Sequence, residues 1–121
     1  MDSNETIYFN RKGLSIIPST GEFESLKEGI VKYRKDNKLG YISVSGDEIA
    51  PCIYDYAKEF NNGYAIVGNN NFCGVIDSKG KEIIPIIYQF VCYFDDGLAV
   101  VIKDDVLGFV DVNGMSTFDC K

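Results

Sequence analysis

The side chains that most often perform acid–base or nucleophilic chemistry are sparse in this chain of 121 residues. It contains no histidine, so no catalytic triad and no imidazole general base can be built from it. Asp77 and Asp111 each stand three residues before a glycine, where an aspartate that opens a hairpin turn is expected. The acidic pairs at residues 95–96 and 104–105 could bind a divalent cation, but cation sites built from oxygen ligands usually use more carboxylates at defined spacing. We therefore expect solvated loop charge there and no enzymatic activity.

Cysteine chemistry is disfavoured as well. The four cysteines form no C-x-x-C pair, and no histidine is present to complete a zinc site. A nucleophilic thiol would need a base and an electropositive setting, and the sequence indicates neither. No glycine-rich phosphate loop is present. We expect no metal and no cofactor, and reduced thiols that pack as small apolar side chains, although the count also allows two disulfides. The four are Cys52, Cys73, Cys92 and Cys120.

Composition limits the broad class of the protein. Hydrophobic residues make up 45% of the chain and charged residues 25%, which is typical of one soluble globular domain. No apolar stretch is long enough to cross a bilayer, and residues 1–5 lack the basic start of a secretory signal, so a cytoplasmic location is expected. The net charge of −6 disfavours nucleic-acid binding.

An internal repeat of about 34 residues organises the whole sequence. Three sets of glycines and one set of prolines recur at steps of 33 or 34 residues: Gly13, Gly46, Gly80 and Gly114; Gly29, Gly63 and Gly97; Gly40, Gly74 and Gly108; Pro18, Pro51 and Pro85. Large apolar residues keep the same step at Leu26, Phe60 and Phe94. We divide the single domain, residues 1–121, into repeats at 6–38, 39–72 and 73–106 and a partial capping repeat at 107–121.

Each repeat is expected to supply three short antiparallel strands. In the third copy these are residues 73–77, 81–85 and 97–103, which alternate or are rich in β-branched residues. The four-residue segments that end in the first glycine set are predicted to be hairpin turns. Residues 54–60 have the spacing of one helical turn. The predicted fold is all-β, with three-stranded units stacked into a twisted array or a partly closed barrel, and residues 107–112 complete the sheet of the third unit.

The second copy contains a series of short motifs in a fixed order: Leu39-Gly40-Tyr41-Ile42, Ser45-Gly46, Ile49-Ala50-Pro51, Tyr54-Asp55, Phe60 and Gly63-Tyr64-Ala65-Ile66-Val67. This series resembles the bacterial WG repeat, whose pattern runs roughly K-W-G-Y-I-D, x-x-G, V-I-P, Y-D, F, G-L-A-x-V. The motif tryptophan is replaced in every copy, by Thr6, Leu39, Cys73 and Leu107. The resemblance implies a stacked or curving antiparallel array that serves as a binding or scaffolding element and not as an enzyme.

Differences between the copies indicate where a partner could bind. If the face that carries Ala65 and Ala99 is the core, then Ile66 and Val100 point to solvent, since neighbouring residues of a strand face opposite ways. Together with other apolar residues they would form a patch with an acidic rim, suited to a protein partner. A second packed layer that buries the same residues is the alternative. The candidate residues are Ile66, Ile86, Ile87, Phe90, Val100, Asp95 and Asp96.

Charge gives a second candidate surface. Residues 6–38 hold seven basic and four acidic side chains. Residues 39–72 hold one basic and four acidic side chains, and residues 73–106 hold three basic and six acidic side chains. The basic cluster is either a site for an anionic partner or a solvated face. Its members are Lys27, Lys32, Arg34, Lys35 and Lys38.

Three functions from different classes are compatible with these features. The favoured one is a non-enzymatic protein-binding module, for which an acidic immunity or inhibitor protein that covers a basic effector is the concrete form. The second is a structural or self-associating unit, in which the basic first copy meets the acidic last one. A small-molecule or metal-dependent enzyme is the third.

Overall fold

Strands alone form the regular structure of the part of the chain that the computed structural model describes, residues 21–113. Their order along the chain is β1 (Glu22–Lys27), β2 (Ile30–Lys35), β3 (Lys38–Ser43), β4 (Glu48–Tyr54), β5 (Tyr56–Ala57), β6 (Tyr64–Asn69), β7 (Phe72–Asp77), β8 (Glu82–Tyr88), β9 (Phe90–Val91), β10 (Leu98–Lys103) and β11 (Val106–Asp111).

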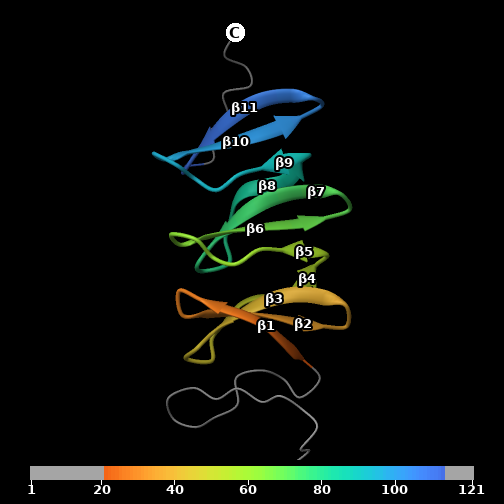
Figure 1. Ribbon diagram of the computed structural model, residues 1–121, viewed down its shortest axis with the longest axis vertical. Helices are drawn as coiled ribbons and strands as arrows, with labels where there is room; N and C mark the ends of the chain where they lie inside the picture. The colour runs from red at the N-terminus through yellow and green to blue at the C-terminus, as the bar shows by residue number, and fades with distance from the viewer. Residues whose placement is uncertain (1–20, 114–121) are drawn as a thin grey trace, which may run out of the picture.

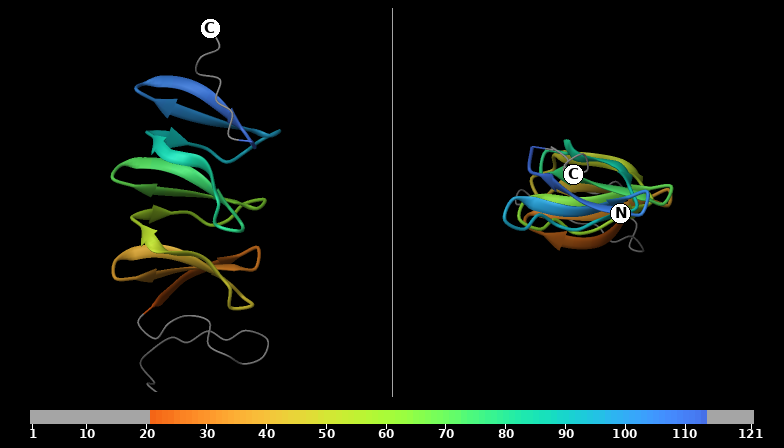
Figure 2. Two further views of the ribbon diagram at one scale, coloured as in Figure 1. Left: turned by 180° about the vertical axis from the view of Figure 1, so that it is seen from behind. Right: turned by 90° about the horizontal axis from the view of Figure 1, so that it is seen from above.

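These strands form three separate antiparallel sheets that stack along the long axis of the molecule (Figure 1). The first sheet has the order β1-β2-β3-β4, the second β5-β6-β7-β8 and the third β11-β10-β9. The hairpins β2–β3, β6–β7 and β10–β11 lie one above the other with their turns on the same side (Figure 1). Seen along the long axis, the three sheets superimpose (Figure 2). The all-β repeat array is thus confirmed, as an open stack.

The boundaries of the sheets do not coincide with those of the repeats. Each sheet begins late in one repeat and ends within the next, so β6 of the repeat at 39–72 pairs with β7 of the repeat at 73–106. A single residue, Asp55 or Gln89, joins the last strand of one sheet to the first strand of the next. Because the linkers are so short and the pairings cross the repeat boundary, no repeat can complete its hydrogen bonds alone.

The expected helical turn at residues 54–60 is wrong. This segment contains the end of β4 and the two-residue strand β5, an element that the sequence did not predict. The backbone N–H groups of Asp55 and Lys58 donate to the carbonyl oxygens of Gly68 and Ile66 at 3.0 and 2.9 Å. The neighbouring strand β6 therefore takes the hydrogen bonds that a helical turn would have kept within the segment.

Two kinds of tight turn connect the strands. In the turn between β7 and β8, the Asp77 carboxylate accepts the N–H groups of Lys79 and Lys81, both at 2.9 Å, and Gly80 has a φ of +83°. This confirms the predicted role of Asp77. The acidic residues Asp104 and Asp105 form the two-residue turn between β10 and β11, with φ of +52° and +65°. Short polar residues tolerate this left-handed conformation, so this pair has a structural role.

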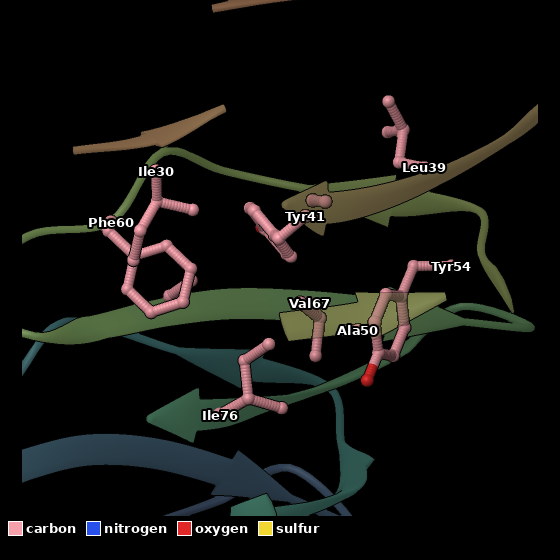
Figure 3. Packing of buried hydrophobic residues seen from close by; sticks show 10 residues of the cluster. Ile30, Leu39, Tyr41, Ala50, Tyr54, Phe60, Val67 and Ile76 are labelled. Atoms are coloured by element: carbon pink, nitrogen blue, oxygen red, sulfur yellow. The ribbon is translucent and has the colours of Figure 1, made fainter. Parts of the chain in front are cut away.

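The hydrophobic core lies between the sheets, in layers. Here the C-terminal face of a sheet is the one turned toward the next sheet along the chain, and the N-terminal face is the opposite one. In the layer between the first and second sheets, Tyr41 and Phe60 contact edge to face, with ring centroids 4.9 Å apart (Figure 3). A second layer fills the space between the second and third sheets and includes Ile66, Val75 and Val101. The middle sheet is therefore buried on both faces.

Candidate functional site

A solvent-open hollow of about 410 Å³ lies between the second and third sheets, beside the turn that joins β6 to β7. Its floor is formed by β6 and β7, and β5 and β9 contribute the walls. The residues that line it are Asp55, Tyr56, Lys58, Ile66, Gly68, Asn69, Asn70, Asn71, Phe72, Cys73, Gln89, Phe90 and Val91.

The hollow exists because one cross-strand pair is small. Gly68 and Cys73 stand opposite each other in the β6–β7 hairpin. The same pair is Arg34 with Leu39 in the first sheet and Ile102 with Leu107 in the third. Cross-strand partners project from the same face of a sheet, so a glycine beside a cysteine leaves space that the large pairs would fill.

Three half-exposed aromatic side chains surround the hollow. Tyr56, Phe72 and Phe90 have exposed fractions of 47%, 46% and 49%. A Cβ atom added to Gly68 would lie 3.5 Å from the Tyr56 ring, so this ring lies directly beside Gly68. The same added atom would come within 2.7 Å of the Phe72 carbonyl oxygen, and so Gly68 also permits the close approach of the turn. Exposed aromatic groups around a cavity are the usual anchors of a binding surface.

The place that corresponds to the hollow in the junction between the first and second sheets is filled. There the Lys38 ammonium forms an ion pair with the Asp55 carboxylate, and Lys32 Nζ donates to the Ala57 carbonyl oxygen at 3.0 Å. Lys38, followed by the Asn70 backbone N–H group, lowers the pKa of the Asp55 carboxyl below its usual value. Leu39, at 4% exposure, fills the remaining space.

None of these closing interactions recurs at the second junction, because the residues at the same repeat positions differ. Phe72 stands where the first junction has Lys38, and Gln89 stands where it has Asp55. Gln89 instead accepts the Asp105 backbone N–H at 2.7 Å. The second junction is thus open at the positions of Phe72 and Gln89 and bordered by aromatic side chains, whereas the ion pair Lys38–Asp55 occupies the same positions in the first junction.

A second cavity, of about 380 Å³, shares two lining residues with the hollow, Tyr56 and Lys58. Its other lining residues are Lys27, Lys32, Ala57, Glu59, Phe60, Asn61 and Tyr93. Burial raises the pKa of Tyr93 to about 12, so its hydroxyl is protonated at neutral pH and donates to the Glu59 carbonyl oxygen at 2.5 Å.

The predicted apolar patch does not form as one surface. Ile66 is 3% exposed in the layer between the second and third sheets, so its predicted exposure is wrong and the alternative, a second packed layer, holds for this residue. Ile86 packs against the other layer, on the opposite side of the same sheet. Ile87 and Phe90 are exposed, and Val100 is half-buried. Asp95 and Asp96 are exposed in the tight turn before β10, away from the residues that line either cavity. Of the candidate set, Ile66 and Phe90 come together in the hollow.

The predicted basic cluster is also divided. Lys27 and Lys32 line the second cavity. Arg34 pairs with Glu24 at 3.0 Å, and Lys38 pairs with Asp55. Lys35 is three residues from Lys32 along β2, so the pleat directs the two side chains to opposite faces. Only part of the cluster therefore borders a cavity.

Residues suited to metal binding or to nucleophilic attack are not grouped within residues 21–113, where no set of three potential ligands occurs together. Cys52, Cys73 and Cys92 are half-buried free thiols, and Cys120 lies outside the described residues. Burial raises the pKa of Cys52 and of Cys73, which keeps both as neutral thiols at neutral pH. No helix of residues 21–113 has the length and hydrophobicity of a membrane span.

Comparison with known families gives a match over more than half of the chain. The family model for WG-containing repeats matches residues 40–71 and 74–106, in two adjacent copies. The chain belongs to the WG-repeat family. In this WG-repeat protein the position of the motif tryptophan is occupied by Leu39 in the first sheet and by Cys73 in the second, so the hollow opens where the side chain at that position is small. No curated protein and no solved structure matches the chain.

Sequence analysis named Ile66 and Phe90 but missed Gly68, Tyr56 and Phe72, although two signals for the hollow were present. Gly68 belongs to none of the three repeated glycine sets, which indicates a local role. Tyr56 and Phe90 are aromatic residues 34 positions apart in the same register. Neither signal shows that Phe72 lines the same cavity as Phe90, because this depends on how the second and third sheets stack.

Proposed function

We propose that this WG-repeat protein is a non-enzymatic protein-binding module and that the hollow receives an apolar side chain of its partner. The observation that supports this most directly is the group of half-exposed aromatic residues around one cavity, Tyr56, Phe72 and Phe90. Aromatic residues at the centre of a contact contribute most of the binding free energy in many interfaces. The polar residues Asn70, Asn71 and Gln89 border the same cavity, as the rim of an interface requires.

The proposal predicts that Phe72→Glu abolishes capture of the partner from the native cell. Burying a carboxylate against apolar partner groups costs at least about 2 kcal/mol, which corresponds to a thirtyfold or larger loss of affinity. The matched control is Val106→Glu, because Val106 occupies the same hairpin position in the third sheet and is 52% exposed. Capture is measured by quantitative mass spectrometry with wild-type protein and both variants as baits. Proteins retained equally by all three baits rule out the hollow as the binding site.

Self-association is a second candidate, favoured by the C-terminal face of the third sheet. The cross-strand pair Val100 and Phe109 occupies the same hairpin position as the pair Ile66 and Val75 of the second sheet. The third sheet covers Ile66 and Val75. On this face Leu107 is 60% exposed. The sheet of a second copy would cover this side chain as the third sheet covers the second.

If copies stack through this face, wild-type protein elutes above monomer size in gel filtration at low and high salt, because apolar contacts are little affected by screening. Leu107→Glu is then expected to elute as a monomer. A monomer at every salt concentration for wild-type protein contradicts self-association. Phe72→Glu serves as the control that should leave the elution volume unchanged.

A further inference from the structure

We infer that the hollow and the adjoining cavity act as one groove for an extended acidic peptide segment, which places an apolar side chain among the aromatic residues and carboxylates beside the lysines. This inference rests on the proposed protein-binding function and adds the chemistry of the partner. We call the two cavities together the groove.

Two shared residues place the two cavities next to each other. Tyr56 and Lys58 line both cavities, with Ala57 between them in the chain. The backbone of this segment is fixed on both sides. Lys58 N–H bonds to Ile66 of β6, and the Ala57 carbonyl oxygen accepts from Lys32 of β2. A ligand that spans the two cavities would therefore cross a rigid wall, which lowers the entropic cost of binding.

The charges along the groove differ from those of the molecule as a whole. Three lysines, Lys27, Lys32 and Lys58, line the second cavity, and Glu59 is the one acidic residue in its lining. The ion pairs within residues 21–113 are Arg34–Glu24 and Lys38–Asp55, so no carboxylate of this part of the chain forms an ion pair with any of the three lysines. Glu28, next to Lys27, accepts the backbone N–H groups of Asn62 and Gly63 at 2.6 and 2.9 Å. A basic strip on a protein of net charge −6 favours an acidic ligand.

The positions of the aromatic side chains and of the lysines along the groove define the chemistry of the ligand. The aromatic side chains of Phe72 and Phe90 are at one end, and Lys27 and Lys32 from the first sheet are at the other. An extended segment that follows the groove from one end to the other presents side chains to both ends. A segment with an apolar residue close to two or three carboxylates complements both. A basic effector, which the acidity of the whole chain had suggested, does not match the lysines at this site.

The test is a selection of random peptides displayed on phage against the full-length protein, with counter-selection against Phe90→Glu. The inference predicts that the enriched peptides combine an apolar residue with at least two acidic residues. The best peptide is then synthesised with its carboxylates intact and with all of them replaced by amides. We expect the amide form to bind about fivefold or more weakly by fluorescence anisotropy, and the difference to shrink as salt is raised.

Lys58→Glu is expected to weaken binding of the acidic peptide by at least about fivefold. Lys79→Glu is the matched control, since it makes the same charge change on an exposed residue that lines neither cavity. Circular dichroism on both variants verifies folding. Equal binding of the acid and amide peptides, no effect of Lys58→Glu, or enrichment of neutral or basic peptides would each overturn the inference. The proposed function is tested separately: a captured partner lost with Phe72→Glu but kept with Lys58→Glu leaves that function intact and removes the acidic ligand.

Discussion

Gly80→Ala is expected to be among the most destabilising single substitutions in the chain. Gly80 closes the turn between β7 and β8 with a φ of +83°, which costs about 1–2 kcal/mol for a residue with a Cβ atom. In addition, an added Cβ atom would lie 2.0 Å from the carbonyl oxygen of Ile49 in β4. Since this neighbour is backbone, it cannot rotate away, and overpacking of this kind adds about 1–3 kcal/mol or more.

The matched control is Gly63→Ala. Gly63 has a similar φ of +87°, but an added Cβ atom would meet nothing within 4 Å. We expect this variant to lose only the conformational part, about 1–2 kcal/mol, in urea denaturation. The difference between the variants then measures the contact of one sheet's turn with the preceding sheet. Equal losses would show that the turn of the second sheet does not press against β4 in solution.

Phe60→Ala is expected to lower the free energy of unfolding by about 3–5 kcal/mol. The Phe60 side chain is 1% exposed and contacts the edge of Tyr41 with an interplanar angle of 79°. Its removal leaves a cavity between the first and second sheets and also deprives Tyr41 of its aromatic partner. The Tyr41 hydroxyl donates to the Lys58 carbonyl oxygen at 2.5 Å, so the ring cannot swing into the space without losing this hydrogen bond.

Phe94→Ala provides the comparison, because Phe94 stands 34 positions later in the same register. Phe94 is half-buried and contacts Tyr64 with ring centroids 4.7 Å apart. Its truncation exposes the site to water instead of leaving an enclosed void, so we expect a loss of less than about 2 kcal/mol. A larger loss for Phe94→Ala than for Phe60→Ala would contradict the burial that distinguishes the two junctions.

The turns and strands of this protein were largely predictable because their signals are local. Asp77 opens a turn and Gly80 closes it through hydrogen bonds and a φ value that depend on a few neighbouring residues. The strands predicted at residues 73–77, 81–85 and 97–103 are found as β7, β8 and β10. The short strands β5 and β9 were not predictable, since two residues carry no periodicity and their pairing is with β6 and β10.

The faces of the strands were predicted less well, and Ile66 shows why. Alternation along a strand separates two faces, but it indicates which face is exposed only when one of them meets water. In the middle sheet, Ala65 packs toward the first sheet and Ile66 packs toward the third. Both faces of this sheet are core, so the alternation along β6 did not show that Ile66 is buried.

The sequence by itself determined the period, the glycines and prolines that keep it, and the hairpin turns, because these follow from backbone conformations that a few neighbouring side chains impose. The tertiary structure decided which differences between copies matter for binding. The small pair Gly68 and Cys73 becomes a hollow only where β9 of the next sheet brings Phe90 beside Phe72. Lys27 and Lys32 come beside Lys58 only because the first sheet lies against β5. The residues that line each cavity together are about 20 to 30 positions apart in the sequence. Their positions relative to one another depend on how the sheets pack.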